Sequence, residues 1–236
     1  MKRLMFVIAG TMLFLAPTLF AQNTPMYFNG GYQGNNWTYG SETVGTGFYD
    51  GSINNVQVGP GQAGGPGMIC DDFNDNIYAG EHWTANGINA ASLTSSNIGQ
   101  TLFGGLGVQG YDELAYLAYQ MLKNPGMDGA TQAAYAEAIW ALTGGVNPAS
   151  LGTTAYSLYT NVLSGTETLT QSQLASLWIY TPNPKTGIGN GEAQEMWGLV
   201  PVPEGGTTFG YLLLGGISCF GAMFLRQRRE RATPTA

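Results

Sequence analysis

Cysteine and histidine are almost absent from this chain. Its 236 residues contain two cysteines, Cys70 and Cys219, and one histidine, His82. Because Cys219 lies in a hydrophobic run near the C-terminus, the two cysteines are not expected to pair, which excludes an internal disulfide framework. A cysteine hydrolase would have to use Cys70 and His82, but nothing around either residue matches a cysteine-hydrolase signature. We expect residues 81–84, around the histidine, to form a surface strand edge instead.

Basic residues are scarce between the two ends of the chain. Only Lys123 and Lys185 lie between residues 22 and 200, against 13 acidic residues, so this span carries a net charge of −11. An acidic domain without a basic patch is poorly suited to nucleic acid, and anionic lipid surfaces would repel it. The charge instead favours solubility or the attraction of divalent cations.

The N-terminus has the pattern of a secretory signal peptide. Lys2 and Arg3 precede an apolar run from Leu4 to Phe20, and Ala21 precedes polar residues. This pattern predicts a signal peptide at residues 1–21, export through the Sec translocon and cleavage after Ala21. An uncleaved membrane anchor is the alternative. In either case residues 22–200 form an ectodomain long enough for one domain with its own core.

The C-terminus combines a short Pro/Gly motif, a hydrophobic run and a basic tail. The motif spans residues 201–206 and contains Val202, Pro203, Glu204, Gly205 and Gly206. Residues 207–225 carry no charge, and as a helix they would be about 28 Å long, close to the thickness of a bilayer core. The tail at residues 226–236 contains Arg226, Arg228, Arg229 and Arg231. These arginines are costly to translocate and should stay in the cytoplasm.

This three-part tail resembles the PEP-CTERM class of bacterial sorting signals, in the variant spelled VPEGG or VPDSG. The resemblance implies that an exosortase, a membrane enzyme, recognises the motif and processes the chain beside the transmembrane helix. An ordinary single-pass C-terminal anchor is the alternative. Both interpretations place the ectodomain outside the cytoplasmic membrane. The prolines and glycines of residues 201–208 predict an extended linker ahead of the helix.

The first part of the ectodomain predicts β structure. Between residues 26 and 58, short aromatic and β-branched runs alternate with Gly and Asn, as in an antiparallel meander. We expect Asp50-Gly51-Ser52 to make a tight hairpin turn between the last two runs. Residues 59–67 hold five glycines and two prolines and predict a loop. Residues 68–70 predict a short buried strand.

The middle of the ectodomain predicts helices. The apolar spacing indicates a helix from Asp112, as its N-cap, to Lys123 and a second helix over residues 131–142. Two shorter helices are expected at residues 154–163 and 170–178. A strand at residues 193–199 should then pair with the N-terminal sheet. The fold class is therefore α+β: an N-terminal antiparallel β meander, a helical middle, a closing strand and one C-terminal transmembrane helix.

The segments around Cys70 and Trp140 resemble the thioester domain of bacterial surface adhesins. In that domain a strand cysteine is joined to a glutamine in a Gln-x-Ala-Ile-Trp helix, and the resulting thioester captures a nucleophile. Cys70 matches the cysteine, and residues 138–140 match Ala-Ile-Trp, but the glutamine position is Ala136. Glu137 is one residue away and Gln132 one turn earlier. The sequence thus favours a degenerate scaffold with Cys70 as a buried, unmodified thiol, and leaves a thioester at Cys70 as the alternative.

Aspartates follow Cys70 in a dense cluster. Asp71, Asp72 and Asp75, with Asn74 and Asn76, offer the hard oxygen ligands that Ca²⁺ prefers. They do not match an EF-hand, since Ile77 and Trp83 occupy the positions where such a loop needs Gly and Glu. We therefore expect a solvated acidic turn rather than a metal site, and no cofactor.

The sequence thus predicts a non-enzymatic, exported protein of the cell surface or extracellular matrix that an exosortase processes. Its 13 tyrosines and five tryptophans can form a surface that stacks on carbohydrate, so exopolysaccharide is a candidate partner. The first alternative is a covalent adhesin that uses a thioester at Cys70, and the second is a hydrolase.

Overall fold

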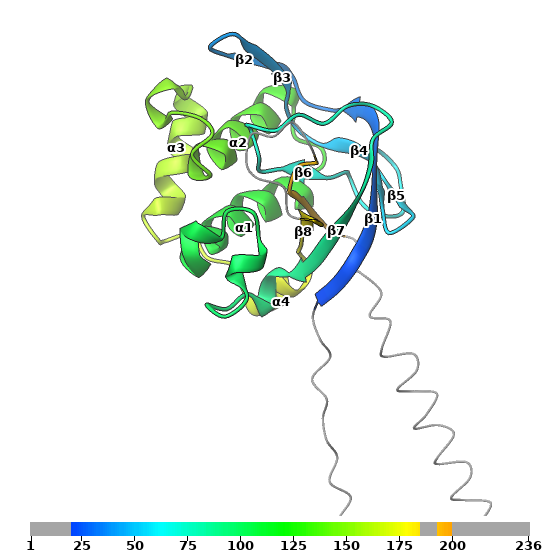
Figure 1. Ribbon diagram of the computed structural model, residues 1–236. Coiled ribbons are helices and arrows are strands. Elements are labelled where there is room, and N and C mark those ends of the chain that lie inside the picture. Colours follow the sequence, from blue (N-terminus) through cyan, green and yellow to red (C-terminus); the bar gives the residue numbers. More distant parts are fainter. Residues whose placement is uncertain (1–19, 185–192, 200–236) are drawn as a thin grey trace, which may run out of the picture. The chain divides into compact units, whose positions relative to one another are not determined.

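An antiparallel sheet and a group of helices pack face to face in the computed structural model, which describes residues 20–184 and 193–199 (Figure 1). The strands are β1 (Phe20–Tyr32), β2 (Asn36–Tyr39), β3 (Glu42–Gly45), β4 (Tyr49–Ile53), β5 (Val56–Val58), β6 (Ile69–Cys70), β7 (His82–Asn89), β8 (Trp178–Pro182) and β9 (Met196–Gly198). Seven of them form one sheet in the order β5-β4-β1-β7-β8-β9-β6, and β2 pairs with β3 in a separate hairpin. The predicted α+β class is confirmed for this part of the chain.

Four α-helices follow the first seven strands. They are α1 (Gly107–Lys123), α2 (Gly129–Leu142), α3 (Thr153–Leu163) and α4 (Gln171–Ala175), and short 3₁₀ helices lie at Ala90–Ser92, Ile98–Gln100, Gly104–Leu106 and Pro148–Ser150. No helix among the described residues is long and apolar enough to cross a bilayer. The predicted transmembrane helix at 207–225, the sorting motif, the basic tail and most of the signal peptide lie outside the described residues.

The N-terminal meander is present, but one of its turns is not where the sequence predicted it. Asp50, Gly51 and Ser52 lie inside β4, and the turn to β5 is made by Asn54 and Asn55. These two residues have φ angles of 52° and 63°. A two-residue hairpin of this type needs positive φ at both positions, and asparagine tolerates that conformation better than most residues.

Strand β1 lies between β4 and β7 and begins two residues before the predicted mature N-terminus. Phe20 pairs with Ile88, and Ala21 pairs with Gly87. Cleavage after Ala21 would therefore remove the first two residues of β1 and leave its pairing from Thr24 onward intact. The cleavage itself stays a prediction.

Helix α1 starts earlier than predicted. It begins at Gly107, directly after a 3₁₀ turn, and Asp112 lies within it rather than at its N-cap. The predicted end at Lys123 is confirmed, and the apolar face that includes Leu114, Leu117 and Met121 is buried. Helix α2 also begins two residues early, because the Asp128 carboxylate caps it by accepting hydrogen bonds from the N–H groups of Ala130 and Thr131.

Strand β8 was missed, and the strand expected around His82 is present as the start of a longer strand, β7. The sequence predicted a helix over residues 170–178, but α4 ends at Ala175 and β8 begins at Trp178. All five residues of β8 are buried, so no alternation of polar and apolar residues marks it as a strand. Strand β7 pairs with β1 from His82 onward and with β8 from Ala85 onward. Its first residue, His82, is exposed as expected, whereas the rest of the strand lies inside the sheet.

The sheet is buried on both faces where it carries β8 and β9. Ile179 and Trp197 belong to a core shared with α1 and α2. Their strand neighbours Tyr180 and Met196 belong to a second core, which also contains Met26, Phe28 and Cys70. The predicted closing strand is thus confirmed as β9, and it brings the residues just before it against the segment that follows Cys70.

Candidate functional site

The acidic segment after β6 is buried, not solvated as the sequence suggested. Asp71, Asp72 and Asp75 are at most 2 % exposed. The cause is the segment at residues 194–197, which covers the aspartates and leads into β9, the strand that pairs with β6. This contact joins parts of the chain more than 100 residues apart, so no local pattern predicted it. The three buried aspartates lie in two different environments: Asp71 contacts Trp197, and Asp72 and Asp75 line a pocket.

Asp71 points into the main core, where it helps to hold β9. Its Oδ2 accepts a hydrogen bond of 2.7 Å from the indole N–H of Trp197. Beside it, the buried carboxyl of Glu195 accepts hydrogen bonds from the Leu102 N–H at 2.7 Å, from the Tyr111 hydroxyl at 2.5 Å and from the Thr181 hydroxyl. Burial raises the pKa of Asp71 well above its usual range, and also raises the pKa of Glu195. The pair links the sheet to α1 and has a structural role.

Asp72 and Asp75 face a pocket instead. Asp72 Oδ1 accepts a hydrogen bond from the Asn74 N–H at 3.0 Å. Burial and the adjoining Asp75 carboxyl, which interacts directly with that of Asp72, raise the pKa of Asp72 to about 7. Two carboxyl groups so close together in a buried place cannot both be ionised without a compensating positive charge.

Gln194 completes the base of this pocket, and no pattern in the sequence predicted this role. Its side-chain amide donates hydrogen bonds to the carbonyl oxygens of Asp72, at 3.0 Å, and Asp75. The other end of the amide, Oε1, is buried and receives no hydrogen bond from the described residues. Gln194 therefore fixes the turn between the two aspartates and leaves one acceptor unsatisfied.

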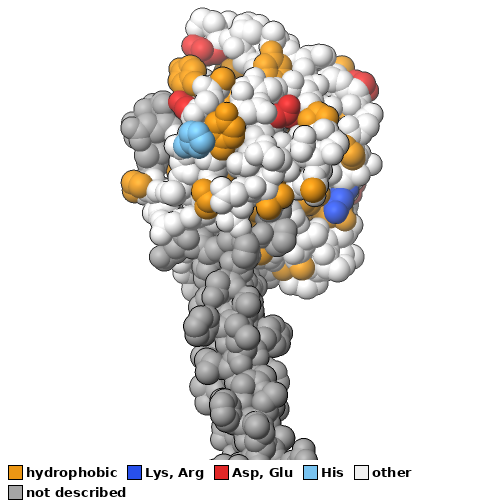
Figure 2. Space-filling model, turned by 90° about the vertical axis from the view of Figure 1, so that its right-hand side faces the viewer, with side chains coloured by type: hydrophobic (Ala, Val, Ile, Leu, Met, Phe, Trp, Pro, Cys, Tyr) orange, Lys and Arg blue, Asp and Glu red, His pale blue; other side chains and the backbone are white. Residues whose placement is uncertain are grey.

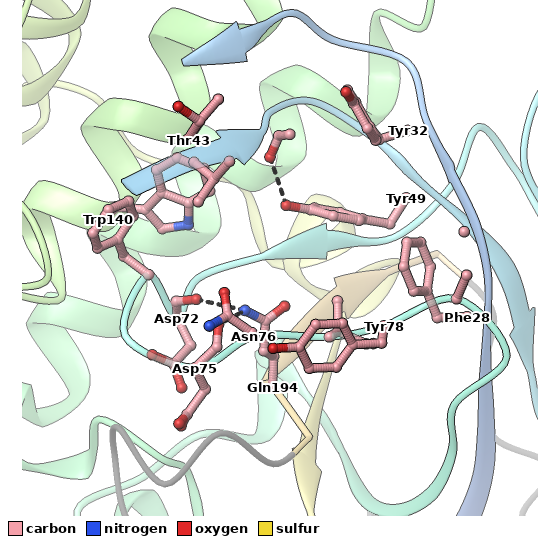
Figure 3. Close-up of a pocket in the computed structure, with 16 residues that line it drawn as sticks. Phe28, Tyr32, Thr43, Tyr49, Asp72, Asp75, Asn76, Tyr78, Trp140 and Gln194 are labelled. Atoms are coloured by element: carbon pink, nitrogen blue, oxygen red, sulfur yellow. Dashed lines mark hydrogen bonds between the residues drawn. The ribbon is translucent and has the colours of Figure 1, made fainter. Parts of the chain in front are cut away.

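The pocket has a volume of about 300 Å³, and six of the 16 described residues that line it are aromatic. Figure 3 shows Asp72, Asp75, Asn76 and Gln194 close together on one side, with the aromatic residues around them. Trp140 and Tyr49 are buried, whereas Tyr32 and Tyr78 are 42 % and 60 % exposed at the rim. The aromatic lining residues are Phe28, Tyr32, Tyr49, Phe73, Tyr78 and Trp140.

The β2–β3 hairpin closes one side of the pocket. Trp37 and Tyr39 stack with ring centroids 5.5 Å apart, and both pack edge-on against Phe73. The Tyr39 hydroxyl accepts a hydrogen bond from the Asn147 N–H after α2. At the base of the hairpin, a Cβ on Gly45 would lie 2.8 Å from the Tyr32 ring, so only glycine lets that ring lie against the hairpin.

Cys70 is buried, as predicted, and lies next to the predicted helix. The indole N–H of Trp140 donates a hydrogen bond of 3.2 Å to the carbonyl oxygen of Cys70. The thiol itself donates to the carbonyl oxygen of Asp72 at 3.0 Å. Burial, followed by the Asp72 and Asp71 carboxylates, raises the pKa of the thiol well above its usual value. This environment suppresses the thiolate, which is the reactive form.

A thioester needs an acyl partner beside the Cys70 thiol, and none of the three residues considered for that role makes a contact with it that would allow the bond. Ala136 is buried in the main core and has no carboxamide. The Gln132 amide donates to the carbonyl oxygen of Met127, at the start of α2 and two turns before Trp140. The Glu137 carboxylate accepts a hydrogen bond from the backbone of Gly152, at the start of α3.

Cys70 and His82, the pair that a hydrolase would need, are also apart. Strands β8 and β9 lie between their strands in the sheet. The His82 ring stacks on Tyr27, with centroids 4.4 Å apart. Figure 2 shows the histidine in pale blue on the surface of the domain, whereas Cys70 lies in the core. The geometry therefore does not support a Cys–His nucleophile.

Within the part of the chain that the structure describes, no group of three or more His, Cys, Asp or Glu side chains could hold a metal ion. Asp71, the third of the predicted calcium candidates, is turned away towards Trp197.

Comparison with known proteins gives no relative. No family model, no curated protein and no solved structure matches this chain.

Proposed function

We propose that this chain is a non-enzymatic, exported protein of the cell surface or extracellular matrix, which binds saccharide in the pocket around Tyr78 and is processed by an exosortase. The aromatic pocket is the observation that carries the binding role. Export and processing rest on the two terminal sequence patterns, which lie outside the described residues.

The chemistry of the pocket suits a sugar. Aromatic faces pack against the C–H groups of sugar rings, and Tyr32 and Tyr78 present such faces at the rim. Asn76 beside them is exposed and offers both hydrogen-bond donors and an acceptor to sugar hydroxyls. A volume near the lower end of the range for small-molecule sites, roughly 300 to 1,000 Å³, is suited to one or two sugar rings.

The charge of the pocket selects among saccharides. Two aspartates line it, and no Lys, Arg or His is among its described lining residues. A polymer of uronic acids or sulfated sugars would bring further negative charge towards these carboxylates. The proposed ligand is therefore a neutral or amino-bearing polysaccharide.

Binding of the full-length chain, purified in detergent, to immobilised polysaccharide tests this role. We expect retention on a neutral glucan, weaker retention on alginate, and loss of retention in Tyr78→Ala. Tyr78 is 60 % exposed, so its replacement should leave the fold intact. Tyr156→Ala is the matched control, because Tyr156 is an exposed tyrosine on α3 that does not line the pocket. Equal retention of the wild type and Tyr78→Ala, or stronger retention on alginate, would refute the proposal.

A further inference from the structure

An Asn-Gly pair lies in the irregular part of β1. Asn29 and Gly30 are both exposed, and Gly30 has a φ angle of 100°. The pairing of β1 with β4 shifts register between Phe28 and Tyr32, and its pairing with β7 stops before these residues. Residues 29–31 therefore have no assigned partner in either neighbouring strand, and the sheet restrains their backbone less than it restrains the rest of β1.

The chemistry of an Asn-Gly pair is a spontaneous deamidation. The backbone nitrogen of the glycine attacks the side-chain Cγ of the asparagine and forms a C–N bond. The side-chain nitrogen leaves as ammonia and takes the proton of the backbone nitrogen with it, so a cyclic succinimide remains. Water then opens the ring at either carbonyl and gives aspartate or isoaspartate. Glycine favours the first step because it has no Cβ to hinder the attack and few restrictions on its φ and ψ angles.

The surroundings of Asn29 favour this reaction. The backbone N–H of Gly31 donates a hydrogen bond of 3.0 Å to Asn29 Oδ1. Attack on Cγ places negative charge on that oxygen, and a donor already aimed at it stabilises the charge. Because the side chain is exposed, water can reach the ring and ammonia can leave.

A second Asn-Gly pair in the described residues has the opposite surroundings. Asn86 and Gly87 lie within β7, where they pair with Thr181 and Tyr180 of β8. Gly87 and the side-chain oxygen of Asn86 are buried. Ring closure here requires the sheet to open first, which costs free energy that Asn29 does not spend. The third pair, at residues 190–191, lies outside the described residues.

We propose that Asn29 is a modification site, at which the folded chain deamidates spontaneously to aspartate and isoaspartate while Asn86 is protected. The product alters the wall of the pocket, because Gly30 lines it together with Phe28 and Tyr32 on either side (Figure 3). Aspartate adds a negative charge to this wall. Isoaspartate adds the same charge and also lengthens the backbone by the Cβ atom of residue 29.

Incubation of the full-length chain in detergent, followed by peptide mass mapping, tests the site. The Asn29 peptide should gain the mass difference between OH and NH₂ and separate into aspartate and isoaspartate forms. We expect conversion at Asn29 to be at least about tenfold faster than at Asn86, since a local opening that costs only about 1.4 kcal/mol already slows a reaction tenfold. In urea, where the sheet is absent, the two sites should react at similar rates.

The same measurement can overturn the proposal. It is wrong if Asn29 stays intact in the folded chain, or if Asn29 and Asn86 convert there at equal rates. If Asn86 remains slow in urea, its neighbours in the sequence protect it, and the assigned role of β8 is wrong. Asn29→Ser is the matched control, because the serine hydroxyl can also accept from the Gly31 N–H but cannot form the ring.

The effect of the modification on the pocket rests on the proposed saccharide binding, whereas the modification itself does not. We expect retention of the wild type on a neutral glucan to fall during incubation in proportion to the isoaspartate formed. Retention of Asn29→Ser should stay constant over the same period. If isoaspartate forms at Asn29 and retention does not change, the modification stands and its effect on the pocket is wrong.

Discussion

At the scale of single residues, Cys70 shows how burial controls chemistry. Its thiol lies in the second core and donates a hydrogen bond to the carbonyl oxygen of Asp72, within the same turn. Burial, and after it the nearby carboxylates, raise the pKa of the thiol, so the reactive thiolate is scarce at neutral pH. We therefore interpret the contact between Cys70 and Trp140 as structural: it helps to hold β6 against α2 and does not serve a thioester.

We predict that Cys70 reacts slowly with iodoacetamide in the native protein and rapidly once the protein is unfolded. Peptide mass mapping measures this separately from Cys219. The Cys70 peptide should have its unmodified mass. A mass deficit of one ammonia, restored by addition of methylamine, would show a thioester and contradict this prediction.

At the scale of elements, the turn between β4 and β5 depends on two asparagines. Both have positive φ angles, which cost most residues with a Cβ about 1 to 2 kcal/mol. This turn sets the register in which Ile53 pairs with Val56, and Ile53 is fully buried in the second core. The hairpin is thus fixed by local backbone geometry as well as by packing.

We predict that Asn55→Ala lowers the free energy of unfolding by about 1 kcal/mol, because alanine is strained at this φ angle. Asn55→Gly should match or exceed the wild type, since glycine adopts positive φ freely. Urea unfolding of the three proteins measures the difference. If alanine and glycine behave alike, the turn does not have the positive φ angles described here.

At the scale of the whole molecule, buried carboxyl groups dominate the response to pH. Burial is the main cause that raises the pKa values of Asp71, Asp72, Asp112, Glu137 and Glu195, and Asp128 is lowered by its hydrogen bonds at the N-cap. A group whose pKa is higher in the folded state holds its proton more tightly there. Its contribution to stability is complete below the unfolded-state pKa and is lost as the pH rises through the folded-state pKa.

We predict that, in EDTA, the domain is more stable at about pH 5 than at about pH 7.5, with a slope of about −1.4 kcal/mol per pH unit for each extra proton held by the folded state. For Asp72 the loss runs from about pH 4, the usual pKa of aspartate, to its folded-state pKa of about 7. Chemical denaturation across this range measures the slope, and Asp72→Asn should make it shallower. A stability that rises with pH would contradict the assignment.

The proposed sorting signal is also tested on the whole chain. Changing Pro203 and Glu204 to alanine alters only the motif, so the described domain should fold as before and the precursor should accumulate, unprocessed, in the membrane. Immunoblotting of membrane and extracellular fractions detects this. Release of the double variant at the normal rate would show that the tail is an anchor and no sorting signal. Labelling of residues beyond 226 from outside the cell would contradict the expected cytoplasmic position of the arginines.

The sequence by itself determined the features that depend on neighbouring residues. Residues 131–142 have helical spacing and form α2, the Gly/Pro-rich residues 59–67 form a loop, and the apolar residues 68–70 are buried. The strands of the meander and the closing strand were likewise visible as short aromatic and apolar runs. In each case the residue types and their period act within one element, so a local pattern is sufficient.

Only the tertiary structure decided the features that depend on distant segments. Strand β8 is buried on both faces and so lacks a strand-like alternation. The pairing of β6 with β9 buries Asp71, Asp72 and Asp75 and places Gln194 between two of them. Whether an aspartate is solvated or buried depends on which segment covers it, and here that segment lies about 120 residues away in the chain. For this reason the pocket and the residues at its base come together only in the folded domain.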